Sequence, residues 1–193
     1  MNESANSNDA MTAAMTGANG MDESATIHGR FHFDLYEYEG GPLIRSWEQD
    51  NVVTTVGKNL ALDTYLAGSS YTVTGPFMGL ISSTSFSAVA AADTMSSHAG
   101  WLEAGNANAP TYTSPRKTAA WSSAASGNKS LSSALSFTFT GSGTVQGAFL
   151  TYGTGAVSTI DSTAGTLYSA GTFASAQPVI SGNILNVSYT ASL

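Results

Sequence analysis

Apolar and polar residues alternate clearly from Phe31 onward. Phe31, Phe33 and Leu35 fall on one face of an extended segment, and the residues between them are polar. Glycine and proline at positions 40–42 supply the residues of a turn, after which Leu43–Trp47 forms a returning segment. This pattern predicts a β-hairpin with one apolar face.

A helical pattern follows the hairpin. Val52 and Val53 are expected to extend the returning strand, and Thr54 or Thr55 is expected to cap a helix. Apolar residues then recur with helical spacing until Gly68, which is expected to end the helix. The expected apolar stripe consists of Val56, Leu60, Leu62, Tyr65 and Leu66. Two strands and this short helix form a unit on which later strands can pack.

The rest of the chain consists of short apolar segments separated by turn residues. Residues 88–97 are expected to form a helical turn or a loop, and residues 105–115 a loop. Residues 144–152 are apolar on both faces, which predicts a central strand. Strands are expected at 77–81, 101–103, 118–122, 135–139, 144–152, 167–173, 177–180 and 184–193. Many short strands and one early helix predict a mainly β fold, an antiparallel β-sandwich or jelly-roll-like domain.

Residues 1–25 have a different composition from the rest. They are rich in Asn, Ser, Ala and Met, contain no aromatic residue and carry four acids without a base. Such a segment buries too little apolar surface to offset its own ordering entropy. We therefore predict an extended N-terminal arm at 1–25 and a β-rich body at 26–193, with Met11, Met15 and Met21 as the residues that anchor the arm on a partner. The alternative is that the arm folds back on its own body.

Charge is sparse and unevenly placed. The net charge of −7 lies entirely in residues 1–50, because residues 51–193 carry four acids and four bases. Nucleic-acid binding requires a basic surface that neutralises phosphates, so no nucleic-acid partner is expected. Charged residues make up 10% of the chain, against about a quarter in typical soluble domains. A surface of Ser, Thr, Ala and Gly favours close packing against neighbouring subunits, although an ordinary Ser/Thr-rich β domain has the same composition.

The chain lacks cysteine, which excludes disulfides, thiolate metal sites and a cysteine nucleophile. The N-terminal sequence has neither the basic nor the apolar region of a signal peptide. Its apolar runs fall short of the ~18 residues that a transmembrane helix needs. Synthesis in the cytoplasm, without a membrane partner, is therefore expected.

Candidate catalytic patterns are weak. His28 and His32 are four residues apart, which on a strand separates them by roughly 13 Å and argues against a metal site. His98 has no Gly-x-Ser-x-Gly motif to accompany it. Glu37 and Glu39 precede a turn, where a solvated edge is favoured over a glycosidase pair. No catalytic, cofactor-binding or metal-binding residue is expected.

Several segments carry a resemblance to a known family. Residues 51–59 (NVVTTVGKN) and the LALDTYL that follows resemble a segment of small virion proteins of tailed bacteriophages. So do residues 78–81 (MGLI), 93–101 (DTMSSHAGW) and 185–193 (LNVSYTASL). The resemblance covers about residues 31–193 and offers no catalytic residue.

The resemblance implies a non-enzymatic structural protein of the virion, of the capsid decoration (cement) type. Such proteins often combine a β domain with a terminal arm that crosses onto neighbouring capsid subunits. The implied partners are the major capsid protein and further copies of this chain, with assembly in the bacterial cytoplasm.

Two alternatives remain open. One is a tail- or fibre-associated adhesion module in which Trp47, Trp101 or Trp121 forms a platform for stacking against a carbohydrate. The other is a hydrolase whose site the sequence does not reveal.

Overall fold

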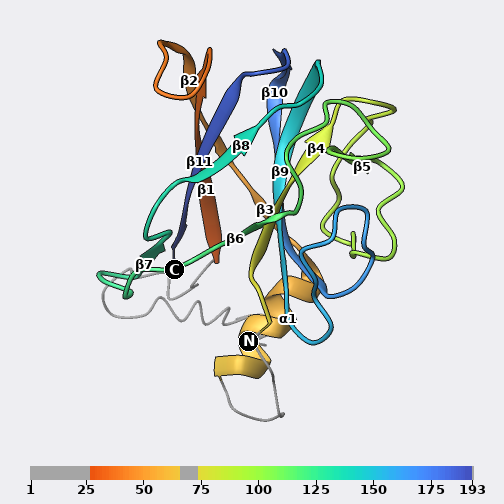
Figure 1. The fold of residues 1–193 in the computed structure, drawn as a ribbon. Coiled ribbons are helices and arrows are strands. Elements are labelled where there is room, and N and C mark those ends of the chain that lie inside the picture. Colours follow the sequence, from red (N-terminus) through yellow and green to blue (C-terminus); the bar gives the residue numbers. More distant parts are fainter. Residues whose placement is uncertain (1–26, 66–73, 193) are drawn as a thin grey trace, which may run out of the picture.

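In its described residues the fold is a mainly β sandwich of two antiparallel sheets with one helix. The structure, a computed structural model, describes residues 27–65 and 74–192 (Figure 1). The predicted arm at 1–25, with Met11, Met15 and Met21, lies outside the described residues, as do Leu66 and Gly68. The sequence prediction of an antiparallel sandwich with a single helix is confirmed for the described part of the chain.

The first sheet contains the predicted hairpin and the C-terminal strand. Its main path is β2–β1–β11, and two short strands, β7 and β8, both pair with β11. Neighbouring strands are antiparallel, with Phe31 opposite Tyr189 and Phe33 opposite Trp47. The strands are β1 His28–Tyr36, β2 Leu43–Asp50, β7 Asn128–Ser130, β8 Leu135–Thr138 and β11 Ile184–Ser192.

The second sheet follows the path β3–β10–β9–β4–β5, and β6 also pairs with β4. β9 lies between β10 and β4, so the prediction of a central strand there is confirmed. The strands are β3 Val52–Val53, β4 Phe77–Ser82, β5 Leu102–Glu103, β6 Lys117–Thr118, β9 Gly143–Tyr152 and β10 Thr166–Val179.

The core lies between the sheets and is rich in aromatic rings. Phe31, Phe33 and Leu35 are buried, as the alternation predicted. The ring of Phe33 stacks on Trp47 of β2 at 5.2 Å and meets the edge of Phe173 of β10 at 4.7 Å. These contacts join strands of both sheets, so the two faces are held together by a layer of interlocking rings.

Three predicted strand boundaries were wrong. Val52 and Val53 do not extend β2; they pair with β10 in the opposite sheet. The chain crosses between the sheets at Asn51, whose N–H donates to Gly29 C=O at 3.0 Å and whose side-chain amide donates to the Tyr189 hydroxyl at 2.8 Å. These two bonds hold Asn51 on the first sheet, and the chain passes from there to the second sheet, although the sequence pattern predicts one continuous strand.

The other two corrections concern the bounds of β10 and β6. The segments expected at 167–173 and 177–180 form one strand, β10, which has an irregular register between Thr172 and Gln177 and ends at Val179, before Ile180. The strand expected at 118–122 is limited to β6, and Trp121 instead forms an isolated bridge to Leu131. Residues 88–97 form turns and loops, in agreement with the loop alternative.

Helix α1, Thr55–Tyr65, begins at the predicted position. Thr54 is the cap, because its Oγ1 accepts the N–H of Gly57 at 3.0 Å and its C=O accepts the N–H of Lys58 at 2.9 Å. Leu60 is buried, but Leu62 is 52% exposed, so the predicted stripe was wrong at Leu62. Leu62 is rotated by about 200° from Leu60 around the helix axis and therefore faces away from the sheet.

Gly57 sets the distance between α1 and β10. A Cβ atom at this position would overlap the backbone oxygen of Tyr168. In the interior of an exposed helix, replacing glycine by alanine stabilises the helix by about 1 kcal/mol. Here we expect a net loss of about 1–2 kcal/mol in the free energy of unfolding, because a Cβ forces the helix away from the sheet. Urea unfolding of both proteins measures this difference.

Lys58→Ala is the matched control, at an exposed position in the same turn of the helix. Its free energy of unfolding is expected to stay within about 0.5 kcal/mol of the wild-type value. A Gly57→Ala protein as stable as the wild type would contradict the close approach of α1 to β10.

Buried tyrosines make the fold sensitive to alkali. Burial raises the pKa of Tyr112, Tyr168 and Tyr189. Above about pH 10 the unfolded chain releases phenolic protons that the folded protein retains, so the free energy of unfolding falls as the pH rises. Each such tyrosine adds a slope of at most about 1.4 kcal/mol per pH unit.

We expect Tyr189→Phe to reduce the slope of the free energy of unfolding against pH, above about pH 10, by at most about 1.4 kcal/mol per pH unit. Urea unfolding in a series of buffers from about pH 8 to about pH 11 measures the slope for both proteins. An unchanged slope in the variant would show that Tyr189 ionises equally well in the folded protein.

Candidate functional site

Exposed apolar side chains gather at one end of the sandwich. Tyr38, Leu43 and Ile44 lie at the tip of the β1–β2 hairpin, and Ile180 lies in the β10–β11 turn; each is more than half exposed. Asn183 connects these two turns, because its side-chain amide donates to Glu37 C=O at 2.9 Å. Figure 1 shows both turns at the same end of the molecule. We refer to Tyr38, Leu43, Ile44 and Ile180 as the apolar end.

Strand β2 is an edge strand of the first sheet. Among the described residues it pairs only with β1, and its first four residues are exposed. Proteins usually protect such edges with charged residues, because unpaired backbone groups can add a strand from another chain. Glu48 and Asp50 provide charge in the second half of β2, where both bond to Arg30. In the first half the one charged residue is Arg45, which donates to the side chain of Gln177 in β10 at 2.7 Å. Leu43 and Ile44 precede it without a charge, so the uncharged start of this edge is continuous with the apolar end.

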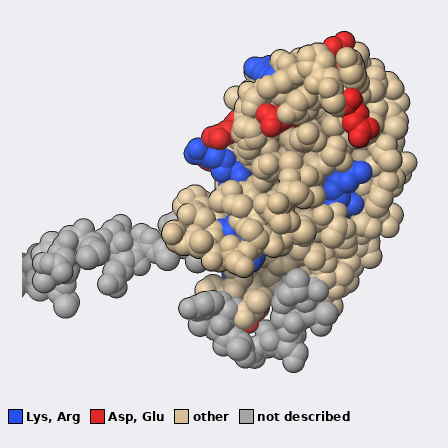
Figure 2. All heavy atoms as spheres, turned by 60° about the vertical axis from the view of Figure 1, so that its left-hand side comes forward, with Lys and Arg blue, Asp and Glu red and all other residues tan. Residues whose placement is uncertain are grey.

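The remaining surface carries few charges. Figure 2 shows a face on which acidic and basic side chains are sparse and intermixed, with uncharged residues between them. No basic patch of the kind that binds phosphates is visible on that face. This agrees with the sparse charge of the sequence.

The three tryptophans do not form a common platform. Trp101 is 1% exposed, donates its indole N–H to Asp93 at 3.0 Å and stacks on His98 at 3.9 Å. Its predicted role as an exposed stacking platform was therefore wrong, because the second sheet and the 83–100 loop bury it. Trp47 and Trp121 are half-buried and pack against the main core.

His32 lies in a polar cluster that resembles a catalytic arrangement in composition only. Its Nε2 atom is 3.2 Å from Asp34 and 3.5 Å from the hydroxyl of Ser46, and its Nδ1 atom is 3.7 Å from Glu48. A general base contacts the nucleophile through one nitrogen and its orienting carboxylate through the other, both at hydrogen-bonding distance. Here Ser46 and Asp34 share one nitrogen on an open strand face, so this geometry does not activate the serine.

The other predicted chemical residues lie apart. His98 contacts Trp101 through its ring and through Nδ1, which is 3.0 Å from Trp101 C=O. Glu37 and Glu39 are exposed in the hairpin turn, as the sequence indicated. Within the described residues, no group of three His, Asp or Glu side chains converges on a point where a metal ion would bind.

A buried ion pair anchors the loops of the second sheet. Arg116 donates to both carboxylate oxygens of Glu103, at 2.8 and 2.6 Å. The guanidinium also donates to Val157 C=O at 3.2 Å and to Ser162 C=O at 2.7 Å. Glu103 in turn accepts the N–H of Asp161 at 2.8 Å. Two side chains thus connect the region around β5 and β6 with the loop that joins β9 to β10.

The electrostatics of this pair favour fixed geometry over added stability. Burial raises the pKa of the Glu103 carboxyl above its usual value, and the hydrogen bond from Arg116 opposes that shift. The stability contributed by this group is therefore greatest below the pKa of the unfolded chain and declines as the pH rises through the folded pKa. A buried ion pair often adds little net stability, but either partner alone is costly. The pair therefore acts mainly to hold the loops in register.

Sequence reasoning missed this pair. The signal was available in weak form, because Glu103 and Arg116 are two of only eight charged residues in positions 51–193. Glu103 follows the apolar pair Trp101–Leu102, and a charged residue in such a position is seldom buried without a partner, but the sequence does not identify Arg116 as that partner. The apolar end was missed as well, because Ile180 and Leu43 are brought together only by the fold.

In its described residues the protein is a β-sandwich with an exposed apolar end, and its edge strand β2 begins with two uncharged apolar residues. Comparison of the chain with protein-family models, with curated proteins and with solved structures found no match. In the described part of the chain, no helix has the length and apolar character needed to cross a membrane.

Removing one partner of the buried pair is expected to destabilise the protein strongly. Glu103→Ala leaves the Arg116 guanidinium buried without a counterion, and we expect a loss of about 3–5 kcal/mol in the free energy of unfolding. The double variant Glu103→Met/Arg116→Met leaves no unpaired charge and is expected to lose less. Chemical denaturation monitored by tryptophan fluorescence compares the three proteins.

Arg30→Ala is the surface control, because Arg30 pairs with Glu48 and Asp50 in solvent, and little change is expected. If the double variant is less stable than Glu103→Ala, then the pair contributes packing or hydrogen bonds that outweigh its charge.

Proposed function

We propose that this chain is a non-enzymatic structural protein of a tailed-bacteriophage virion, of the capsid decoration (cement) type. Its partners are the major capsid protein and neighbouring copies of itself in the particle. The observation that carries this proposal is the apolar end, which includes the uncharged start of the edge strand β2 at Leu43 and Ile44. The phage origin is supported by the resemblance of residues 51–66, 78–81, 93–101 and 185–193 to small virion proteins.

The mechanism is burial of surface at subunit junctions. Each copy places the apolar end against a capsid subunit, which removes the side chains of Leu43, Ile44, Tyr38 and Ile180 from water. Burial of apolar surface contributes about 25 cal/mol per Å² before the costs of association. The edge of β2, which among the described residues pairs only with β1, supplies backbone donors and acceptors that pair with an extended segment of the partner. Summed over many copies, a modest contact strengthens the shell.

Residues 1–25 supply the second contact in this proposal. Their acidic, Met-containing sequence binds a neighbouring subunit through Met11, Met15 and Met21. A second contact on a tether raises the overall affinity by increasing the effective concentration of the first. Weak sites on the body and on the arm then act together.

The proposal is tested by binding to expanded phage heads that lack this protein. Leu43→Lys/Ile44→Lys places two charges in the apolar end, and we expect at least about a tenfold weaker affinity, because buried unpaired charges are costly. Deletion of residues 1–25 is expected to weaken binding separately, while the body still folds. Co-sedimentation with the heads measures both effects, and circular dichroism verifies folding.

Leu62→Lys is the matched control, because Leu62 is equally exposed but lies on α1, away from the apolar end. Heads that bind the Leu43/Ile44 variant as tightly as the wild type would exclude the apolar end as the docking surface. Heads that bind the truncated chain equally well would exclude the arm.

A further inference from the structure

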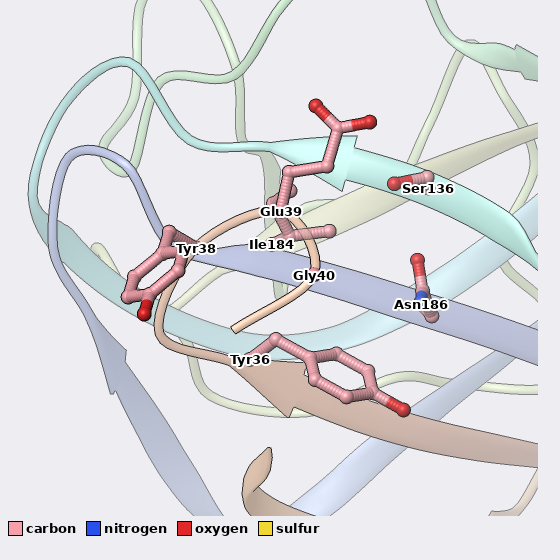
Figure 3. Close-up of a pocket in the computed structure, with 7 residues that line it drawn as sticks. All are labelled: Tyr36, Tyr38, Glu39, Gly40, Ser136, Ile184 and Asn186. Carbon is pink, nitrogen blue, oxygen red and sulfur yellow. The ribbon is translucent and has the colours of Figure 1, made fainter. Parts of the chain in front are cut away.

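A hollow of about 280 Å³ lies beneath the hairpin tip on the outer face of the first sheet. Ile184 and Asn186 of β11 line it together with Tyr36 of β1 and Ser136 of β8, and Glu39 and Tyr38 of the hairpin turn complete its rim (Figure 3). Three strands and one turn therefore contribute to a single depression, which is distinct from the apolar end except for the shared Tyr38.

The hollow is built into the fold. The turn is closed by the N–H of Gly41, which donates to Tyr38 C=O at 2.9 Å, and by the N–H of Glu37, which donates to Pro42 C=O at 3.1 Å. Asn183 fixes the turn to β11 through its 2.9 Å bond to Glu37 C=O. The turn consequently covers Ile184, which is 7% exposed although it lies on the outer face opposite Tyr36. The walls of the hollow are thus held by backbone hydrogen bonds and strand pairing.

The polar groups around the hollow are uncommitted. Within residues 27–65 and 74–192, the side chains of Tyr36, Glu39, Ser136 and Asn186 form no hydrogen bond or ion pair with another protein group. In the view of Figure 3, Asn186 lies between the ring of Tyr36 below it and Ser136 above it. The hollow therefore presents four kinds of group to a ligand: an aromatic ring, an amide, a hydroxyl and a carboxylate.

This combination selects a class of ligand. The hollow is lined by one carboxylate and by no Lys or Arg, so an anionic ligand is disfavoured. An amide that donates and accepts, together with a carboxylate that accepts, matches the adjacent hydroxyl groups of a sugar. The apolar face of a sugar ring also packs on an aromatic ring such as that of Tyr36. The volume of about 280 Å³ lies just below the range of about 300–1,000 Å³ that is usual for pockets of drug-sized ligands, so the hollow suits a single sugar ring and no larger ligand.

We propose that this hollow binds one ring of a neutral saccharide. Tyr36 supplies the stacking surface, and Asn186, Ser136 and Glu39 bond to the hydroxyl groups. The ring is held at the rim of the sandwich, and an oligosaccharide chain leaves through the open side. This inference does not rest on the virion assignment, because the hollow lies on the body itself.

The test uses the full chain, without phage particles, and a panel of neutral sugars: glucose, galactose, mannose and N-acetylglucosamine. Titration is followed by amide chemical shifts in two-dimensional NMR spectra. We expect at least one sugar to bind saturably in the millimolar range, with shifts confined to residues of the hollow. Tyr36→Ala and Asn186→Ala are each expected to weaken that binding at least about tenfold.

Ser188→Ala is the matched control, because Ser188 lies on the same strand and the same outward face, two residues beyond Asn186. It is expected to bind as the wild type does. Tyr36→Phe keeps the ring and tests the hollow if Tyr36→Ala fails to fold; it is expected to retain most of the affinity. Absence of saturable binding to every sugar would overturn the proposal, as would binding that persists in a folded Asn186→Ala variant. Neither result bears on attachment to heads, which is measured separately.

Discussion

The structure depends on the layer of aromatic rings between its two sheets. Phe33 contacts Trp47 within its own sheet and Phe173 across the interface, while Phe31 contacts Tyr189 at 4.6 Å. Large flat rings bury much surface for few rotatable bonds, so a chain with few charges and many small residues still forms a dense core. Asn51 fits the same layer, because its bond to the Tyr189 hydroxyl places the crossing between the sheets directly beside these rings.

Away from this layer, buried polar contacts hold the loops of the second sheet together. The segment from β4 to β9 contains long loops with short strands, and the Glu103–Arg116 pair ties these loops to the loop between β9 and β10. The guanidinium also lies 5.3 Å from the ring centre of Phe149, so it connects the loops with the second sheet. One ion pair therefore converts a loop-rich edge into a fixed surface.

The hairpin tip unites the two proposals made for this protein. Its outer side, with Leu43 and Ile44, presents apolar surface and a strand edge that pairs only with β1 within the described residues, and both features favour contact with another protein. Its other side lines the hollow together with Tyr36 and Asn186. Tyr38 adjoins both regions, so a subunit that covers the tip and a sugar that enters the hollow approach from neighbouring directions.

The sequence by itself determined the local elements: the alternation at Phe31–Leu35, the cap at Thr54 and the central position of 144–152 all follow from periodicity and turn chemistry, which act between near neighbours. It did not determine that Val52–Val53 leave the first sheet, that Trp101 is buried, that Glu103 meets Arg116, or that Tyr36, Ser136 and Asn186 surround one hollow. Only the tertiary structure decided these features. Each depends on residues from segments far apart in the chain, and the pairing of such segments is set by the register of the sheets and the shape of the whole core, which no local pattern encodes.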